Sequence, residues 1–168
     1  MKKSPKLRLS KKHPNKTLIL GLGNTILKDD GIGIYVVREL KKHLRDPNVV
    51  VKEASLGGLE LLELMKGYDH LILIDAMQTG EHDIGTLIKL KAEDLKGGSS
   101  MSRHQVSFSN ALELGRHLNM DLPEKIDIYG IEVMDIFTLE ESCTPEVGAR
   151  IPAIVNDIIQ EWKRESSA

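Results

Sequence analysis

Two adjacent aspartates, Asp29 and Asp30, follow a short apolar run and a glycine-containing loop near the start of the chain. The run ends in Gly21-Leu22-Gly23-Asn24, and Asp30 comes six residues after Asn24. Carboxylates side by side repel each other, and a bound cation would relieve that repulsion. Capping of the helix that follows is the alternative, because aspartate is favoured at helix N-termini. Capping needs only one aspartate, so both interpretations stay open for this stretch.

Two further residues could share a site with this pair. Asp75 closes the apolar run Leu71–Ile74, and an unpaired aspartate is costly to bury. Its alternative role is to cap the turn that follows. His104 stands between a loop rich in glycine and serine and the start of an expected helix. Two carboxylates and an imidazole suit zinc, nickel, cobalt, iron or manganese, and they leave room for water or substrate.

The elements that would position these residues alternate between strand and helix patterns. Strands are expected at 17–21, 49–54, 70–76, 84–91 and 125–133, with helices at 32–44, 58–65 and 105–118. The expected inward face of the second helix holds Leu59, Leu62 and Met65. A final helix is expected to begin with Thr144 as its cap, and Pro152 either kinks it or marks where its regular part begins.

This order of elements predicts a three-layer α/β/α fold with a twisted, mostly parallel sheet of about five strands. The alternation of apolar and polar residues within 84–91 indicates an edge strand. Ligands of such sheets bind beyond the carboxyl ends of the parallel strands. Asp30 and Asp75 are therefore expected at one edge of the sheet, where the loop before His104 could bring an imidazole.

Length and composition indicate one soluble domain. The chain has 168 residues, 40% of them apolar and 29% charged. No apolar run reaches the ~18 residues that a membrane helix needs, and no signal-peptide segment is evident, so we expect a cytoplasmic protein. Its one cysteine, Cys143, excludes an internal disulfide, and a buried or half-buried side chain is favoured there over a nucleophile.

Charge divides the chain at residue 16. Residues 1–16 carry seven Lys and Arg and no acid, which leaves 16 basic and 25 acidic residues in 17–168. We interpret 1–16 as a basic, flexible extension and 17–168 as the single α/β domain. The acidic body argues against a nucleic-acid-binding face.

Several segments of the chain, in this order, resemble the motifs of the hydrogenase maturation endopeptidase family. The resemblance covers about residues 17–160, and the family's fold, a twisted sheet flanked by helices, agrees with the pattern above. The basic extension lies outside the family core. The segments that carry the resemblance are Gly21-Leu22-Gly23-Asn24, Asp29-Asp30-Gly31-Ile32-Gly33, Gly57-Gly58-Leu59-Glu60-Leu61-Leu62, His70-Leu71-Ile72-Leu73-Ile74-Asp75-Ala76 and Ser102-Arg103-His104-Gln105.

The resemblance implies a protease that removes a C-terminal extension from the large subunit of a nickel-iron hydrogenase after nickel insertion. The family's metal-contacting positions match Asp30, Asp75 and His104, and Asp29 would support them or act as a base for water. Nickel would arrive with the substrate, held by its thiolates. The expected partner is thus the large-subunit precursor, met by a monomer, with no membrane or nucleic acid involved.

Three alternatives to this activity remain. Receiver domains of response regulators also place an acidic pair after the first strand and a phospho-accepting aspartate after the third, and bind magnesium. Asp75 follows Asp30 by 45 residues, which fits that layout, but no lysine ends the last strand. A nucleotide-binding loop is disfavoured because Gly21-x-Gly23 lacks the third glycine. Another endopeptidase of the same fold, such as one acting on spore proteins, is not excluded.

Overall fold

The computed structural model describes residues 15–55, 57–91 and 103–168. The expectations for most of the basic extension and for the loop at 92–102 therefore fall outside the described residues. None of the helices in the described part is long and apolar enough to span a membrane. The elements are β1 (Thr17–Leu22), a 3₁₀ helix η1 (Lys28–Gly31), α1 (Ile32–His43), β2 (Val49–Ala54), α2 (Leu59–Met65), β3 (His70–Met77), β4 (Leu87–Lys91), α3 (Arg103–His117), β5 (Lys125–Glu132), α4 (Pro145–Gly148) and α5 (Ile151–Ser166).

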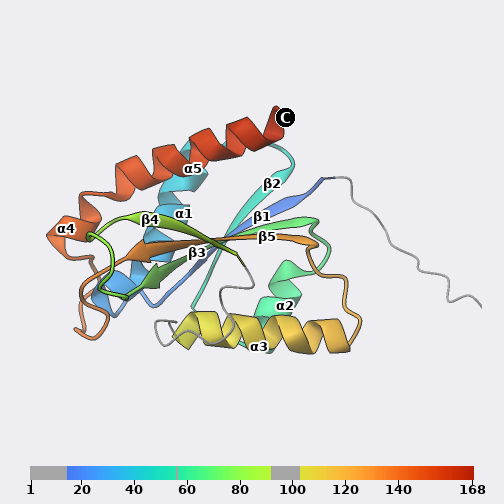
Figure 1. The fold of residues 1–168 in the computed structure, drawn as a ribbon, viewed down its shortest axis with the longest axis horizontal. Coiled ribbons are helices and arrows are strands. Elements are labelled where there is room, and N and C mark those ends of the chain that lie inside the picture. Colours follow the sequence, from blue (N-terminus) through green and yellow to red (C-terminus); the bar gives the residue numbers. More distant parts are fainter. Residues whose placement is uncertain (1–14, 56, 92–102) are drawn as a thin grey trace, which may run out of the picture.

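The five strands form one sheet in the order β2-β1-β3-β5-β4. The pairs β1–β2, β1–β3 and β3–β5 are parallel, and β4 runs antiparallel to β5 at the edge. The prediction of a mostly parallel five-stranded sheet is confirmed, and so is the edge position of the fourth strand. The carboxyl ends of β1, β3 and β5 lie at the same end of the sheet (Figure 1).

Helices cover both faces of the sheet, as Figure 1 shows, with α1 and α5 on one face and α2 and α3 on the other. Each face has its own apolar core, because side chains of a buried strand alternate between the faces. Along β3, Ile72 and Ile74 pack in the core under α1 and α5, whereas Leu71 and Leu73 pack in the core with Phe108 of α3. This alternation determines which face of the sheet each side chain of β3 points toward.

A glycine allows α1 to approach the strand ends closely. A Cβ atom on Gly33 would collide with the backbone oxygens of Leu22, at the end of β1, and of Ile74, within β3. The first turn of α1 therefore lies directly against the carboxyl edge of the sheet, and η1, immediately before it, lies there too. The Asp-Asp-Gly segment is held at this edge by backbone packing.

The last helical segment differs from the single helix expected. It consists of α4 and α5, and Pro152 lies in the first turn of α5, where its fixed φ and missing N–H cost nothing. The interpretation of Pro152 as the start of the regular helix is thus correct. Thr144 is the N-cap residue of α4, but its side chain makes no capping hydrogen bond.

Two other expectations need correction. The strand β3 ends at Met77, so Asp75 lies inside it, paired in register with Gly130 of β5, instead of closing it. The apolar residues after Asp75 continue the buried pattern, which lengthens the strand. In α2, Leu59 is 64% exposed, and Leu61 takes its place on the buried face with Leu62 and Met65.

Candidate functional site

The two adjacent aspartates are buried in η1 at the carboxyl edge of the sheet. Asp29 is fully buried and Asp30 is 7% exposed. Neither η1 nor α1 has a side-chain capping hydrogen bond, so helix capping does not account for this pair. Two carboxylates inside the protein need donors or cations, and the partners of the two residues differ.

Asp30 joins the glycine loop to the start of α3. Its Oδ2 accepts the backbone N–H of Asn24 at 3.0 Å, and the same oxygen lies 3.0 Å from Nε2 of His104. Gly23 makes this wrapping possible, because its φ of 150° and the nearby carbonyl of Asp30 leave no place for a Cβ atom. Two of the predicted site residues, 74 positions apart, are therefore in direct contact.

Asp75 is fully buried on β3. By the alternation along the strand, it shares the face of Leu71 and Leu73, which α3 covers, and α3 begins at Arg103, immediately before His104. Its Oδ1 accepts the backbone N–H of the next residue, Ala76, at 2.9 Å. The structure thus places Asp75 on the face of the sheet from which His104 arises.

The glycine pair Gly57-Gly58 also lies beside the first turns of α3. The backbone N–H of Gly58 donates to the hydroxyl of Ser107 at 3.1 Å, and a Cβ atom on Gly57 would collide with that side chain. This contact places the glycine pair, which belongs to one of the segments that carry the family resemblance, beside α3. It brings a backbone segment without side chains close to His104.

Asp29 has a different set of partners, all of them donors from the end of β5 and the loop beyond it. Its carboxylate accepts the backbone N–H of Thr144 at 2.6 Å and the Thr144 hydroxyl at 3.0 Å. It also accepts the backbone N–H groups of Met134 at 3.3 Å and Asp135 at 3.1 Å. Asp29 therefore ties the loop 134–144 to the segment that carries Asp30.

Two residues that shape this edge were not predicted from the sequence to do so. Thr144 was expected to cap a helix, but its hydroxyl bonds Asp29, which lies 115 positions earlier. Glu132, at the end of β5 and 1% exposed, accepts hydrogen bonds from the N–H and hydroxyl of Thr79 and the N–H of Gly80. No local pattern could have revealed either link, because the partners are far apart in the chain.

Cys143 behaves as a structural residue. It is half-buried and packs against the core under α1 and α5. Burial, followed by the negative charge of Asp29, raises the pKa of its thiol to about 12. The thiol therefore stays protonated near neutral pH and is a poor nucleophile, as the sequence analysis favoured.

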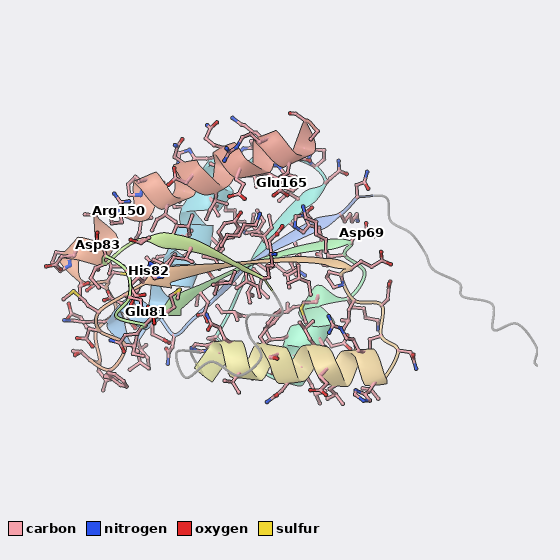
Figure 2. All side chains as sticks on the ribbon, in the orientation of Figure 1. Asp69, Glu81, His82, Asp83, Arg150 and Glu165 are labelled. Atoms are coloured by element: carbon pink, nitrogen blue, oxygen red, sulfur yellow. The ribbon has the colours of Figure 1, made fainter. Side chains whose placement is uncertain are left out.

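A second group of metal-ligand residue types lies at the other end of the sheet. Among the described residues, His70, Asp127 and Glu165 each offer one ligand atom within 4.8 Å of the others. Asp69, just before His70, and Glu81, beyond the end of β3, mark the two ends of the sheet in Figure 2. Asp127 and Glu165 were not singled out from the sequence.

The sequence model described as hydrogenase maturation protease matches residues 34–161 of this chain. The chain belongs to the hydrogenase maturation protease family. It is therefore a peptidase, as the resemblance implied. The matched residues include Asp75 and His104, whereas Asp29 and Asp30 precede them.

Individual relatives of this protease family agree. The chain is 29% identical over 136 residues to the hydrogenase 2 maturation protease of Escherichia coli, covering 79% of this chain and 78% of that protein. It is 26% identical to the hydrogenase expression/formation protein HupD of Rhodobacter capsulatus, covering 89% of this chain and 72% of that one. The E. coli hydrogenase maturating endopeptidase HybD has a similar structure, with a TM-score of 0.76, 25% identity and 89% and 93% coverage.

The strand order of this chain also differs from that of receiver domains, the alternative considered from the sequence. Flavodoxin-like receivers have the strand order 2-1-3-4-5. Here the fourth strand lies outside the fifth and runs antiparallel to it. A fold-level match to the maturation protease HycI of Thermococcus kodakarensis, with a TM-score of 0.67 and 20% identity, points the same way. Fold and family together favour the protease over the phospho-receiver.

Proposed function

We propose that this protease removes the C-terminal extension of a nickel-loaded [NiFe]-hydrogenase large-subunit precursor, and that Asp30, Asp75 and His104 recognise the nickel carried by that precursor. Family membership supports the first part, since relatives are named for hydrogenase maturation. The observation that carries the second part is the contact between the Asp30 carboxylate and the His104 imidazole at the carboxyl edge of the sheet.

The separation of these two groups suits a shared cation. Two ligand atoms that each bind the same ion at about 2.1 Å lie no more than about 4 Å apart. Oδ2 of Asp30 and Nε2 of His104 are 3.0 Å apart. Imidazole and carboxylate are ligands that nickel accepts, so His104 and Asp30 would be able to hold it in place of their mutual hydrogen bond. Asp75, buried on the face of β3 that α3 covers, would complete the set.

The reaction in this proposal is hydrolysis of one peptide bond of the precursor. Water adds to the scissile carbonyl carbon, the C–N bond breaks, and the water's protons end on the new amine and carboxyl groups. Asp29 acts as a positioning residue, because its donors hold the loop 134–144 against η1. Recognition alone would make cleavage depend on nickel through KM, whereas polarisation of the carbonyl by the metal would act through kcat.

The test is a cleavage assay on a cognate large-subunit precursor, with and without nickel, read by intact mass. We expect loss of the C-terminal segment only from the nickel-loaded precursor. Asp30→Ala should lower kcat/KM about 100-fold or more, whereas Asp30→Glu, which keeps a carboxylate, should retain cleavage. Equal cleavage of both precursors, or full activity of Asp30→Ala, would disprove nickel recognition at this site.

The proposal extends to the setting of the reaction. The enzyme would act as a monomer that meets its precursor transiently in the cytoplasm, without a nucleic acid or membrane. One histidine and two carboxylates facing a substrate-borne metal require no second subunit. Gel filtration of the enzyme alone, and of the enzyme mixed with precursor, would measure the two states.

A further inference from the structure

Four large apolar side chains are exposed on two neighbouring loops beside the site. Ile26 is 47% exposed on the glycine loop, and Met134, Phe137 and Leu139 are 47%, 74% and 76% exposed on the loop after β5. Isolated exposed apolar residues are common, but Phe and Leu at three-quarters exposure within one short loop are not. We refer to these four residues as the apolar rim.

The two loops of the apolar rim are joined by backbone hydrogen bonds. The N–H of Glu140 donates to the carbonyl of Ile26 at 3.0 Å, and the N–H of Lys28 donates to the carbonyl of Glu140 at 2.9 Å. The N–H of Asp29 donates to the carbonyl of Asp135 at 2.9 Å. The two loops that carry the rim therefore lie side by side, although Ile26 and Met134 are more than 100 positions apart in the chain.

The loop that presents Phe137 is held in shape from within. The carboxylate of Asp135 accepts the N–H groups of Phe137 at 3.1 Å and Thr138 at 3.0 Å, together with the Thr138 hydroxyl at 2.6 Å. These bonds form a tight turn that keeps Phe137 pointing away from the core. A preorganised exposed aromatic side chain loses little entropy on binding, as suits an anchor at an interface.

The rim is continuous with the proposed active site. Ile26 lies between Asn24 and Asp30, whose contact forms part of that site, and Asp29 bonds both Met134 and Asp135. A macromolecule whose C-terminal segment enters at Asp30 therefore passes next to the rim. The surrounding charge is acidic, since residues 134–142 contain three acids and no base. Lys28 pairs with Asp135 and Glu140 and neutralises only part of that charge.

We propose that the apolar rim is the docking surface for the folded body of the hydrogenase large-subunit precursor, on an apolar patch flanked by Lys and Arg. This inference rests on the proposed function. The apolar side chains supply affinity. The acids Asp135, Glu140 and Glu141 orient the precursor, because charged residues around an interface mainly change the rate of association. Docking at the rim holds the precursor while its extension lies across Asp30 and His104.

The experiment compares rim variants with a matched control on the same nickel-loaded precursor. Phe137→Ser/Leu139→Ser should raise KM about 10-fold or more, with kcat nearly unchanged and the unfolding midpoint preserved. The control is Leu118→Ser, which is 59% exposed just beyond the C-terminal end of α3. That end is about 20 Å along the helix from His104, so KM should stay at the wild-type value.

A second arm tests the charges. Glu140→Gln/Glu141→Gln should slow association with the precursor and weaken its dependence on salt, as stopped-flow binding at several ionic strengths would measure. A rim double variant with wild-type KM, or one that loses kcat alone, would overturn the docking role. An equal KM increase in Leu118→Ser would also overturn it. Failure of the wild-type enzyme to cleave any loaded precursor would instead overturn the proposed function, and with it the partner assigned to the rim.

Discussion

Two histidine–aspartate contacts lie at opposite ends of the sheet, and their surroundings differ. At the carboxyl edge, Nε2 of His104 is 3.0 Å from Oδ2 of Asp30. At the amino edge, Nε2 of His70 is 2.7 Å from Oδ2 of Asp127. The histidine–aspartate distance is thus shorter at the amino edge, where Glu165 also offers a third possible metal ligand.

The environment of the His70 pair is that of a structural ionic network. Lys89 lies within 4 Å of the carboxylates of Asp127, Glu161 and Glu165, and Lys125 bridges Asp127 and Glu165. Trp162 stacks on the His70 ring with centroids 6.2 Å apart. The ammonium groups already compensate the carboxylates, so a metal ion would have to displace them.

The environment of Asp30 is organised differently. Asp30 bonds the backbone of the glycine loop, and its neighbour Asp29 is satisfied by backbone and hydroxyl donors of the loop 134–144. These contacts position carboxylates at the edge where parallel strands end, which is where ligands bind in such folds. Contact between metal-ligand residue types therefore does not by itself define a metal site. The position in the fold and the source of charge compensation do.

The largest expected effect is on activity, and it differs between His104 and His70. His104→Asn should lower kcat/KM for the nickel-loaded precursor about 100-fold or more, since it removes a group that would touch the metal. His70→Asn should stay within about twofold of wild type, because it lies at the far end of the sheet. Intact-mass kinetics on both variants, each shown to be folded by circular dichroism, make the comparison. Comparable losses in both would mean that the two pairs do not differ as proposed.

The second expected effect is on stability, and it differs between Asp29 and Asp127. Asp29→Asn should lower the free energy of unfolding by about 2–3 kcal/mol, because the new amide NH₂ would face donors and leave them unsatisfied. Asp127→Asn should cost about 1 kcal/mol or less, since its lysine partners are partly exposed and screened. Urea denaturation followed by fluorescence of Trp162 measures both. A loss of less than about 0.5 kcal/mol for Asp29→Asn would contradict its role as the tie of the loop 134–144.

The smallest expected effect concerns pH and the amino-edge pair. Burial lowers the pKa of His70, although the hydrogen bond to Asp127 opposes that shift. The unfolded chain then takes up a proton near pH 6.5 that the folded protein resists, so His70 favours folding above that pH and disfavours it below. His70→Gln should therefore reduce the loss of stability between pH 7 and about pH 5.5. Replacement of the exposed His117 by Gln is the control, and an equal change in both variants would remove His70 as the cause.

Much of the site was predictable from local patterns. The glycine loop, the aspartate in an apolar strand and the histidine at a helix start each have a local signature, and the rule for parallel sheets brings their elements to one edge. The contact between Asp30 and His104 agrees with that expectation. Helix boundaries near Pro152 and the end of β3 were harder, because apolar Ala76 and Met77 fit either a strand or a turn.

Other features depended on contacts that no local pattern encodes. Asp29 and Thr144 were each expected beside a helix start, but they bond one another across 115 positions. The apolar rim exists only because the loop after β5 runs beside the glycine loop. The alternation within β4 predicted an edge strand, but the antiparallel pairing of β4 with β5 is seen only in the structure.

The sequence by itself determined the α/β class, the loop after the first strand that leads to Asp30, and the strand that contains Asp75, because apolar periodicity and glycine positions act over a few residues. The tertiary structure decided which of two histidine–aspartate pairs lies at the ligand edge, what Asp29 holds, and where Phe137 and Leu139 are exposed. These three features depend on the strand order and on loops that meet only after folding. They are therefore set by contacts between residues far apart in the chain.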